Sequence, residues 1–223
     1  MMMLLRLEIL CLLLFVSTAT IANPGHLTPV DPYDDHNRVV FETLLADKSV
    51  MFGVLMKPSF KPEKAIFLSA KYQYDENGDV LFDDEDNPKN IEWYLEGTVA
   101  VKNIYYAAVE KNQKIRKLKR VKRLIIPIQK KDFDVIISAW QKVLKQTRYT
   151  DFRHSYSDGT NYIFFVYGMY GETHHPGSSA GIPEKMIKVF DNLWKFLESG
   201  DQGSVEYLEK AKEVSKEILT YGG

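Results

Sequence analysis

The sequence predicts an α+β fold: a mainly antiparallel sheet with three amphipathic helices packed on one face. Residues 49–128 hold a series of short apolar runs separated by turn residues, which is typical of an antiparallel meander. From Asp132 onward the apolar residues change from strand spacing to helix spacing. The strands cannot cover their own apolar face, whereas the helices can, so we expect a single α+β domain over residues 23–223.

Length, composition and charge agree with one folded domain. The chain has 223 residues, of which 45% are hydrophobic, and this excludes a disordered or collagen-like chain. The 29 Lys and Arg residues nearly balance the 30 Asp and Glu residues. The resulting net charge of −1 argues against a dedicated nucleic-acid-binding protein.

Residues 1–22 are predicted to be a cleaved signal peptide. The segment Ile9–Val16 is wholly apolar, and Thr20 and Ala22 place small residues at the −3 and −1 positions of a cleavage site before Asn23. The apolar stretch of about 13 residues is shorter than the roughly 20 that a bilayer-spanning helix needs; an uncleaved signal-anchor is the alternative. Cys11, the only cysteine, lies in this segment, so the mature protein has no disulfide. We expect a bacterial protein that is periplasmic or secreted.

Five apolar runs in the first part of the chain are predicted to be strands. They are Ser49–Met56, Ala65–Tyr74, Ile91–Leu95, Val99–Val109 and the basic run Lys114–Ile128. A shorter strand, Val80–Phe82, follows the turn signal Asn77-Gly78. Residues 39–45 are apolar apart from Glu42 and Thr43, and their pattern fits a helix and a strand equally well.

Three later stretches have helical spacing. Asp132 is the predicted N-cap of the first, which runs to Leu144. The second starts at Pro183 and ends at Gly200, and the third covers Ser204–Leu219 with Val205 on its inner stripe.

Two further strands and a loop are predicted between the first and second helices. The strands Phe152–Ser157 and Thr160–Met169 flank the hairpin signal Asp158-Gly159. The second strand is apolar on both faces, so we expect it inside the sheet with helices over one side. The stretch Gly171–Gly181 is predicted to be a long loop between a buried strand and a helix, a position at which loops commonly carry function.

The candidate site residues lie in and around this loop. Glu172, His174 and His175 have the chemistry to coordinate a metal or to exchange protons. Adjacent histidine side chains tend to diverge, and no HExxH pattern accompanies them, so we predict neither a metal nor a cofactor. Arg148 and Asp158 could form an ion pair at the base of the hairpin. The candidate binding residues are therefore Arg148, His154, Asp158, Glu172, His174 and His175.

Two charged stretches allow both a solvent-exposed and a ligand-binding interpretation. Asp75, Asn77 and Asp79 match the first three ligands of a calcium loop, but Val80 stands where the loop requires glycine, which favours a solvated hairpin tip. The basic stretch can prevent edge-to-edge pairing of a strand, or it can contact an anionic surface. The residues that would make this contact are Lys114, Arg116, Lys117, Lys119 and Arg120.

Several short sequence segments are distributed over residues 57–195. They are Lys57–Ala65, Asn90–Trp93, Trp140 with Thr147–Tyr149, Asp158–Phe164 and Gly171–Thr173. Together they resemble an uncharacterised family of exported bacterial proteins of unknown function. The resemblance implies export and the same single-domain order, and it implies no activity.

The functional expectation follows from the export signal and from the absence of any complete catalytic motif in the sequence. We expect a non-enzymatic binding or interaction protein of the bacterial envelope, whose partner is a protein or an envelope component and not a nucleic acid. The alternative is a hydrolase with a site around the Gly171–Gly181 loop. It would use Glu172, His174 or His175 together with Asp158 and His154.

Overall fold

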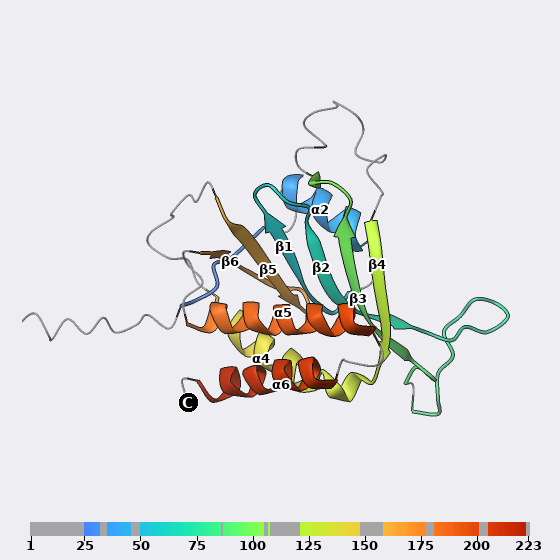
Figure 1. Ribbon diagram of the computed structural model, residues 1–223. Helices are drawn as coiled ribbons and strands as arrows, with labels where there is room; N and C mark the ends of the chain where they lie inside the picture. Colours follow the sequence, from blue (N-terminus) through green and yellow to red (C-terminus); the bar gives the residue numbers. More distant parts are fainter. Residues whose placement is uncertain are drawn as a thin grey trace, which may run out of the picture.

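The computed structural model describes residues 25–31, 35–45, 50–85, 87–104, 107, 121–147, 158–176, 181–200 and 205–221. Within these residues, six strands form one antiparallel sheet, and four α-helices accompany it (Figure 1). The strands are β1 (Phe52–Pro58), β2 (Lys64–Lys71), β3 (Glu92–Ala100), β4 (Val121–Ile128), β5 (Thr160–Val166) and β6 (Met169–His175). The helices are α2 (Asp35–Leu45), α4 (Asp134–Leu144), α5 (Ile182–Ser199) and α6 (Val205–Thr220). The predicted α+β class is confirmed.

The order of the sheet is β4-β3-β2-β1-β5-β6, so its first four strands form the predicted meander. Strand β5 follows helix α4 and returns to pair with β1, where Leu55 lies opposite Ile163. It therefore lies inside the sheet between β1 and β6, as its two apolar faces predict.

The larger core lies between the sheet and helices α4, α5 and α6. Alternate strand residues such as Ile66, Leu95 and Phe164 point to this side and are fully or almost fully buried. Helices α4 and α5 contact the strands, and α6 packs on both of these helices as an outer layer. The prediction of helices on one face is confirmed, with α6 one layer further from the sheet.

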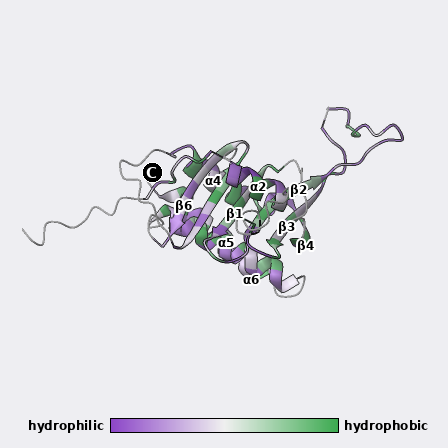
Figure 2. Cartoon of the chain, turned by 90° about the horizontal axis from the view of Figure 1, so that it is seen from above, coloured by the Kyte–Doolittle hydropathy of each residue, from purple (hydrophilic) through white to green (hydrophobic). Residues whose placement is uncertain are grey.

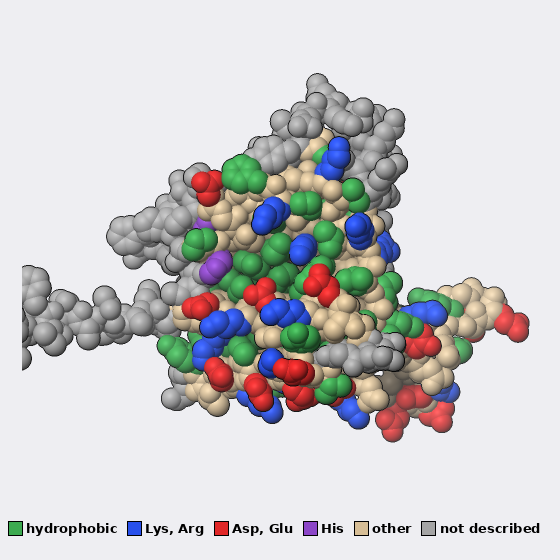
Figure 3. Space-filling model, viewed as in Figure 1, with side chains coloured by type: hydrophobic (Ala, Val, Ile, Leu, Met, Phe, Trp, Pro, Cys, Tyr) green, Lys and Arg blue, Asp and Glu red, His purple; other side chains and the backbone are tan. Residues whose placement is uncertain are grey.

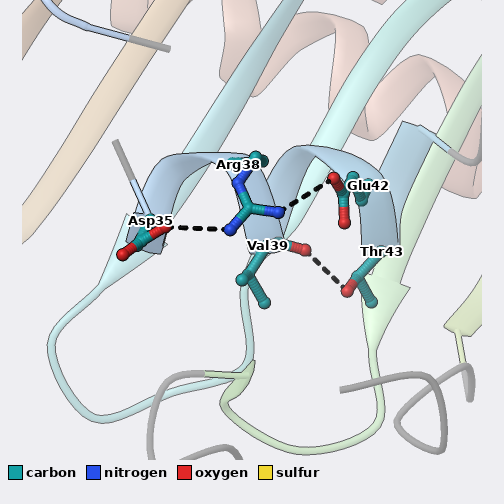
Figure 4. Close-up of polar contacts among 5 residues, drawn as sticks. All are labelled: Asp35, Arg38, Val39, Glu42 and Thr43. Carbon is teal, nitrogen blue, oxygen red and sulfur yellow. Dashed lines mark hydrogen bonds and ion pairs between the residues drawn. The ribbon is translucent and has the colours of Figure 1, made fainter. Parts of the chain in front are cut away.

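Helix α2 covers part of the opposite face of the sheet, which forms a second, smaller core. This result decides the assignment of residues 39–45 in favour of a helix. Helical spacing buries Val39, Val40 and Leu44 together against this face. On the solvent side, the Arg38 guanidinium contacts Asp35 at 2.8 Å and Glu42 at 3.5 Å (Figure 4). The Thr43 hydroxyl donates to the Val39 carbonyl at 2.7 Å (Figure 4).

The predicted loop at residues 171–181 is wrong at its start, because residues 169–175 form strand β6. The connection from β5 to β6 is a two-residue turn in which Tyr167 has φ of 47° and Gly168 has φ of 79°. Two positive φ values are the geometry of the tight hairpin turns whose twist matches that of paired strands. Tyrosine is an unusual first residue for such a turn. The residue types at 167 and 168 therefore did not indicate a hairpin in the sequence.

Several predicted element boundaries are also wrong. The runs Ile91–Leu95 and Val99–Val109 are not two strands: one strand, β3, spans Glu92–Ala100, and the described residues 101–104 and 107 lie outside it. Asp132 lies in a short 3₁₀-helix, and Phe133 occupies the N-cap of α4 without a side-chain hydrogen bond. Val205 does not face inward, since 71% of it is exposed. The run Phe152–Ser157 and the first part of Lys114–Ile128 lie outside the described residues.

The segment between β2 and β3, residues 72–91, projects from the sheet. Figure 2 shows it as a mostly hydrophilic extension. The predicted strand Val80–Phe82 is not formed: Val80 and Phe82 make only isolated bridges, to Tyr74 and Pro88. Figure 3 shows acidic side chains on this extension, whereas acidic and basic side chains alternate over α5 and α6.

Candidate functional site

Strand β6 separates the candidate residues onto two faces of the sheet. Glu172 and His174 point to the face covered by α2, and His175 points to the face covered by α5. The expectation that the two adjacent histidines diverge is therefore confirmed. In the described part of the chain, no group of three or more His, Cys, Asp or Glu side chains is placed to hold a metal ion.

The His174 ring joins β6 to strand β5 and to the turn that precedes β5. Its Nδ1 lies 2.6 Å from Asn161 Oδ1, and its Nε2 lies 2.9 Å from the Asp158 carbonyl oxygen. A carbonyl oxygen can only accept a hydrogen bond, so Nε2 carries a proton and donates it. Gly159 makes room for this ring, since a Cβ atom there would lie 2.5 Å from Nε2. With both ring nitrogens in contact with the hairpin, His174 has a structural role in this geometry.

The backbone of Glu172 holds the N-terminal arm, residues 25–31, against β6. Thr28 and Glu172 exchange two backbone hydrogen bonds of 2.9 and 2.8 Å, and the Thr28 hydroxyl also donates to the Glu172 carbonyl. Next to this bridge, Leu27 is fully buried beside Gly171. The arm therefore covers part of an edge strand that would otherwise offer its backbone groups to another chain.

His175 belongs to a polar cluster on the α5 side of the sheet. Burial raises the pKa of the Asp191 carboxyl, and the positive charges of Lys195, His175 and Lys64 oppose that shift. Burial, together with the charge of Asp191, raises the pKa of Tyr162 to about 12. In this cluster, desolvation outweighs the three nearby basic groups, so an ionised Asp191 costs stability.

We expect Asp191→Asn to raise the midpoint temperature of unfolding at pH 7. The folded-state pKa of Asp191 is above its ordinary value of 3.8, so its stabilising contribution is present at acid pH and is lost as the pH rises. The gain should stay within about 0.5 kcal/mol, because the residue is near the surface, and should vanish below pH 3.8. Thermal unfolding followed by circular dichroism from pH 3 to pH 8 measures it.

Glu206→Gln is the matched control for this experiment. Its partner Lys210 lowers the pKa of Glu206, so neutralising this carboxylate should produce no gain at pH 7. An Asp191→Asn variant that is less stable than the wild type at pH 7, or whose gain persists in acid, would contradict the account of the cluster.

The remaining sequence candidates are placed as follows. Arg148, His154 and the basic residues Lys114, Arg116, Lys117, Lys119 and Arg120 lie outside the described residues, as does any Arg148–Asp158 ion pair. Asp158 contributes its backbone carbonyl to the His174 contact, as described above.

In the acidic segment, two carboxylates are used to hold turns. Asp75 Oδ1 accepts the backbone N–H groups of Asn77 and Asp79 at 2.8 and 2.9 Å. Asp83 Oδ1 does the same, at 2.9 Å each, for Glu85 and Asn87. These hydrogen bonds lower the pKa of both aspartates, with the N–H groups of Asp79 and Asn87 as the largest causes. Both side chains are therefore ionised at neutral pH.

A cavity of about 510 Å³ opens on the α2 side of the sheet, beyond the part that α2 covers. Two of the residues that line it, Ser69 and Glu96, are buried, and Glu96 is only 3% exposed. The Ser69 hydroxyl donates to the Glu96 carboxylate. Tyr74 and Ile125 are more than half exposed and form its rim. The lining residues are Ser69, Ala70, Lys71, Tyr72, Tyr74, Tyr94, Glu96 and Ile125.

Strand pairing assembles this cavity from three strands. Ser69 lies opposite Tyr94, and Glu96 lies opposite Ile125. Tyr94 is oriented by its hydroxyl, which donates to Glu92 at 2.7 Å, and Glu92 also contacts the Lys71 ammonium at 3.6 Å. Sequence reasoning missed this site. Its one local signal is Glu96, a carboxylate within an otherwise buried stretch of β3.

No helix of the described residues is long and apolar enough to cross a membrane. Comparison of the chain with family models, with curated proteins and with solved structures finds no match. Proposals about its function therefore depend on the geometry and chemistry of its own residues.

Proposed function

We propose that this chain is an exported, non-enzymatic binding protein of the bacterial envelope and that it binds its partner in the cavity on strands β2, β3 and β4. The observation that carries the proposal is the cavity itself. Its volume of about 510 Å³ is within the range of roughly 300–1,000 Å³ of ligand-binding pockets. It combines three tyrosine side chains with a few polar groups, the composition of sites that orient a ligand.

Residues 1–22 support the part of the proposal that concerns export. They combine a short apolar stretch with small residues at a cleavage position before Asn23. The expected mature protein begins at Asn23, and N-terminal sequencing of protein from a periplasmic fraction measures this directly. A protein that retains Met1 in that fraction would contradict cleavage.

The geometry of the two described candidate histidines, His174 and His175, favours binding over hydrolysis. The His174 Nε2 proton is donated to the Asp158 carbonyl, so that nitrogen cannot accept a proton from a nucleophile in this arrangement. His175 lies on the other face of the sheet and cannot join it. By contrast, the cavity needs no rearrangement to accept a ligand.

The test compares capture of envelope components by the wild type and by Ile125→Arg. Ile125 is 51% exposed on the edge strand β4, so arginine can replace it without disturbing the core, and its bulk and charge obstruct the cavity rim. Val205→Arg is the matched control, because Val205 is an exposed aliphatic residue on α6. Immobilised mature proteins would be incubated with solubilised envelope, and the bound material would be identified.

We expect a component that the wild type and Val205→Arg retain equally and that Ile125→Arg loses by at least about tenfold, because the arginine obstructs the opening of the cavity. The same captured material on all three proteins, or none on any of them, would contradict binding at this cavity. Circular dichroism of the three proteins establishes that each variant is folded.

A further inference from the structure

Exposed apolar side chains lie at two opposite ends of the sheet, and the charges around them have opposite signs. We infer that the acidic tip of one copy of this chain, residues 75–85, docks on the basic end of a second copy. The basic end is formed by Phe60, Lys61, Val101, Lys102 and Lys122. None of the residues of either surface lines the cavity on β2, β3 and β4, so this contact is separate from the proposed function.

The acidic tip presents apolar side chains on an ordered support. Phe82 is 51% exposed, and its neighbour Leu81 is 37% exposed. The backbone of Leu81 is held on both sides, because its N–H donates to the Gln73 carbonyl at 3.0 Å and its carbonyl accepts from Lys89 at 2.8 Å. The tip has no basic side chain, and its six carboxylates belong to Asp75, Glu76, Asp79, Asp83, Asp84 and Glu85. Large apolar side chains exposed on a projecting segment are typical of a surface that contacts another protein.

The basic end is assembled by the turn between β1 and β2, by the residues after β3 and by the start of β4. The Asn103 side chain donates to the Lys61 carbonyl at 2.9 Å, which holds the first two of these segments together. Val121 lies opposite Ala100, which places Lys122 next to them. The two apolar side chains of the basic end are at least half exposed, and its three lysines are exposed. This surface therefore combines the same kind of apolar group with the opposite charge.

The described carboxylates near the basic end do not cancel its charge. Glu63 is 1% exposed, and both of its carboxylate oxygens accept the Ile104 N–H, at 2.7 and 3.0 Å. The two acidic side chains of the nearby helix α2 both contact Arg38. Asp158 adjoins the Gly159 carbonyl that holds Ser59, on the β5 side of the turn. Positive charge therefore predominates at the basic end.

The two surfaces cannot neutralise each other within one molecule. Strand β2 runs from one to the other, and its eight residues separate them by about 23 Å. The Debye length at physiological ionic strength is about 8 Å, so exposed charges this far apart are largely screened from each other. Figure 1 shows the projecting segment and the turn between β1 and β2 at opposite ends of the strands. Figure 3 shows the Lys and Arg side chains over the upper part of the sheet and the acidic side chains on the projecting segment.

A second copy of the chain is the occupant that the charges select. Contact between two acidic tips, or between two basic ends, would bring like charges together, which is unfavourable. Contact between a tip and a basic end pairs opposite charges and removes apolar side chains such as Phe82 and Phe60 from water. Because the two surfaces differ, each copy can use both of them at once in a heterologous contact.

The test is the oligomeric state of the mature protein, residues 23–223, measured by analytical ultracentrifugation. Small interfaces are weak, so protein concentrations from about 10 µM to about 1 mM are appropriate. We expect the weight-average mass to rise above the monomer mass over this range at about 0.1 M salt. At about 1 M salt, where the Debye length is about 3 Å, the mass should fall toward that of the monomer.

Charge reversal at each end separates this contact from other kinds of association. Asp84→Lys combined with Glu85→Lys reverses charge at the tip and leaves the two aspartates that hold its turns. Lys61→Glu combined with Lys102→Glu reverses charge at the basic end. We expect each double variant alone to associate at least about tenfold more weakly than the wild type. An equimolar mixture of the two should associate like the wild type, because each reversed surface meets its opposite on the other variant.

Two further variants separate the tip from net charge and from the rest of the surface. Glu206→Lys combined with Glu213→Lys makes the same change in net charge on the exposed side of α6 and should associate like the wild type. Phe82→Ser leaves the charge unchanged and should weaken association, and circular dichroism establishes that each variant is folded.

A mixture of the two charge-reversed variants that stays monomeric, or association that persists in each of them alone, would overturn the inference. A wild type that stays monomeric at every concentration would also overturn it and would leave a different, basic partner as the occupant of the tip. The proposed function is judged separately, by the dependence of envelope capture on Ile125, so the two can fail independently.

Discussion

We expect Trp140→Ala to lower the free energy of unfolding by about 3–5 kcal/mol, the range for removal of a large aromatic side chain from a core. Trp140 is completely buried, and its ring stacks on Phe52 with centroids 4.4 Å apart. The edge of Phe164 meets it at 5.0 Å. The indole therefore joins α4 to β1 and β5, which are neighbours in the sheet but distant in sequence. Urea unfolding followed by tryptophan fluorescence and circular dichroism measures the loss.

Trp140→Phe is the informative comparison for this variant. It keeps an aromatic ring against Phe52 but removes the indole N–H, which is buried without a hydrogen-bond acceptor among the described residues. A buried donor without an acceptor costs about 1–3 kcal/mol, so its removal offsets part of the lost packing. We expect Trp140→Phe to cost less than half as much as Trp140→Ala. Equal losses in the two variants would contradict this account of the core.

The second large effect is expected for Gly53→Ala on β1. A Cβ atom at residue 53 would lie 2.6 Å from the Ile66 carbonyl oxygen and 2.4 Å from the Phe165 ring. The ring could turn away, but the carbonyl belongs to the neighbouring strand β2 and can move only if the sheet distorts. We expect a loss of about 3 kcal/mol, at the upper end of the usual range for overpacking, or a protein that does not fold. Chemical denaturation of the purified variant measures the loss, and its recovery in soluble form reports failure to fold.

Gly168→Ala controls for the loss of glycine itself. Gly168 has φ of 79° but open space around it, so its substitution carries a backbone cost of about 1–2 kcal/mol without a steric clash. If Gly53→Ala is no more destabilising than Gly168→Ala, the close approach of β1, β2 and Phe165 is not the reason for a glycine at residue 53.

Much of the fold could be predicted from apolar spacing alone. The meander of β1–β4, the inner position of β5 and the helices α4 and α5 all have patterns that reflect which side of each element is buried. Strand β6 could not be predicted in this way, because its residues 171–175 contain one glycine and four polar side chains. Its pairing depends on the turn at Tyr167 and Gly168, and the tyrosine there adopts a backbone conformation that its residue type rarely takes.

The candidate site was harder to predict than the fold. Glu172, His174 and His175 have reactive side chains, but the alternation of a strand places them on opposite faces, and the strand itself was not predicted. The cavity residues are not close in sequence: Ser69, Tyr94 and Ile125 become neighbours only through the register of β2, β3 and β4. That register depends on contacts between strands, and no local motif encodes it.

The most direct test of the central proposal, that the cavity is where the partner binds, is site-specific photo-crosslinking in bacterial cells that produce the protein. The photoreactive residue p-benzoyl-phenylalanine would replace either Tyr74, a lining residue 57% exposed, or Tyr167, a turn residue 48% exposed. The two positions are similar in residue type and exposure, but only Tyr74 lines the cavity. We predict a discrete crosslinked product from the Tyr74 position and none from the Tyr167 position. The same products from both positions, or none from Tyr74, would contradict the proposal.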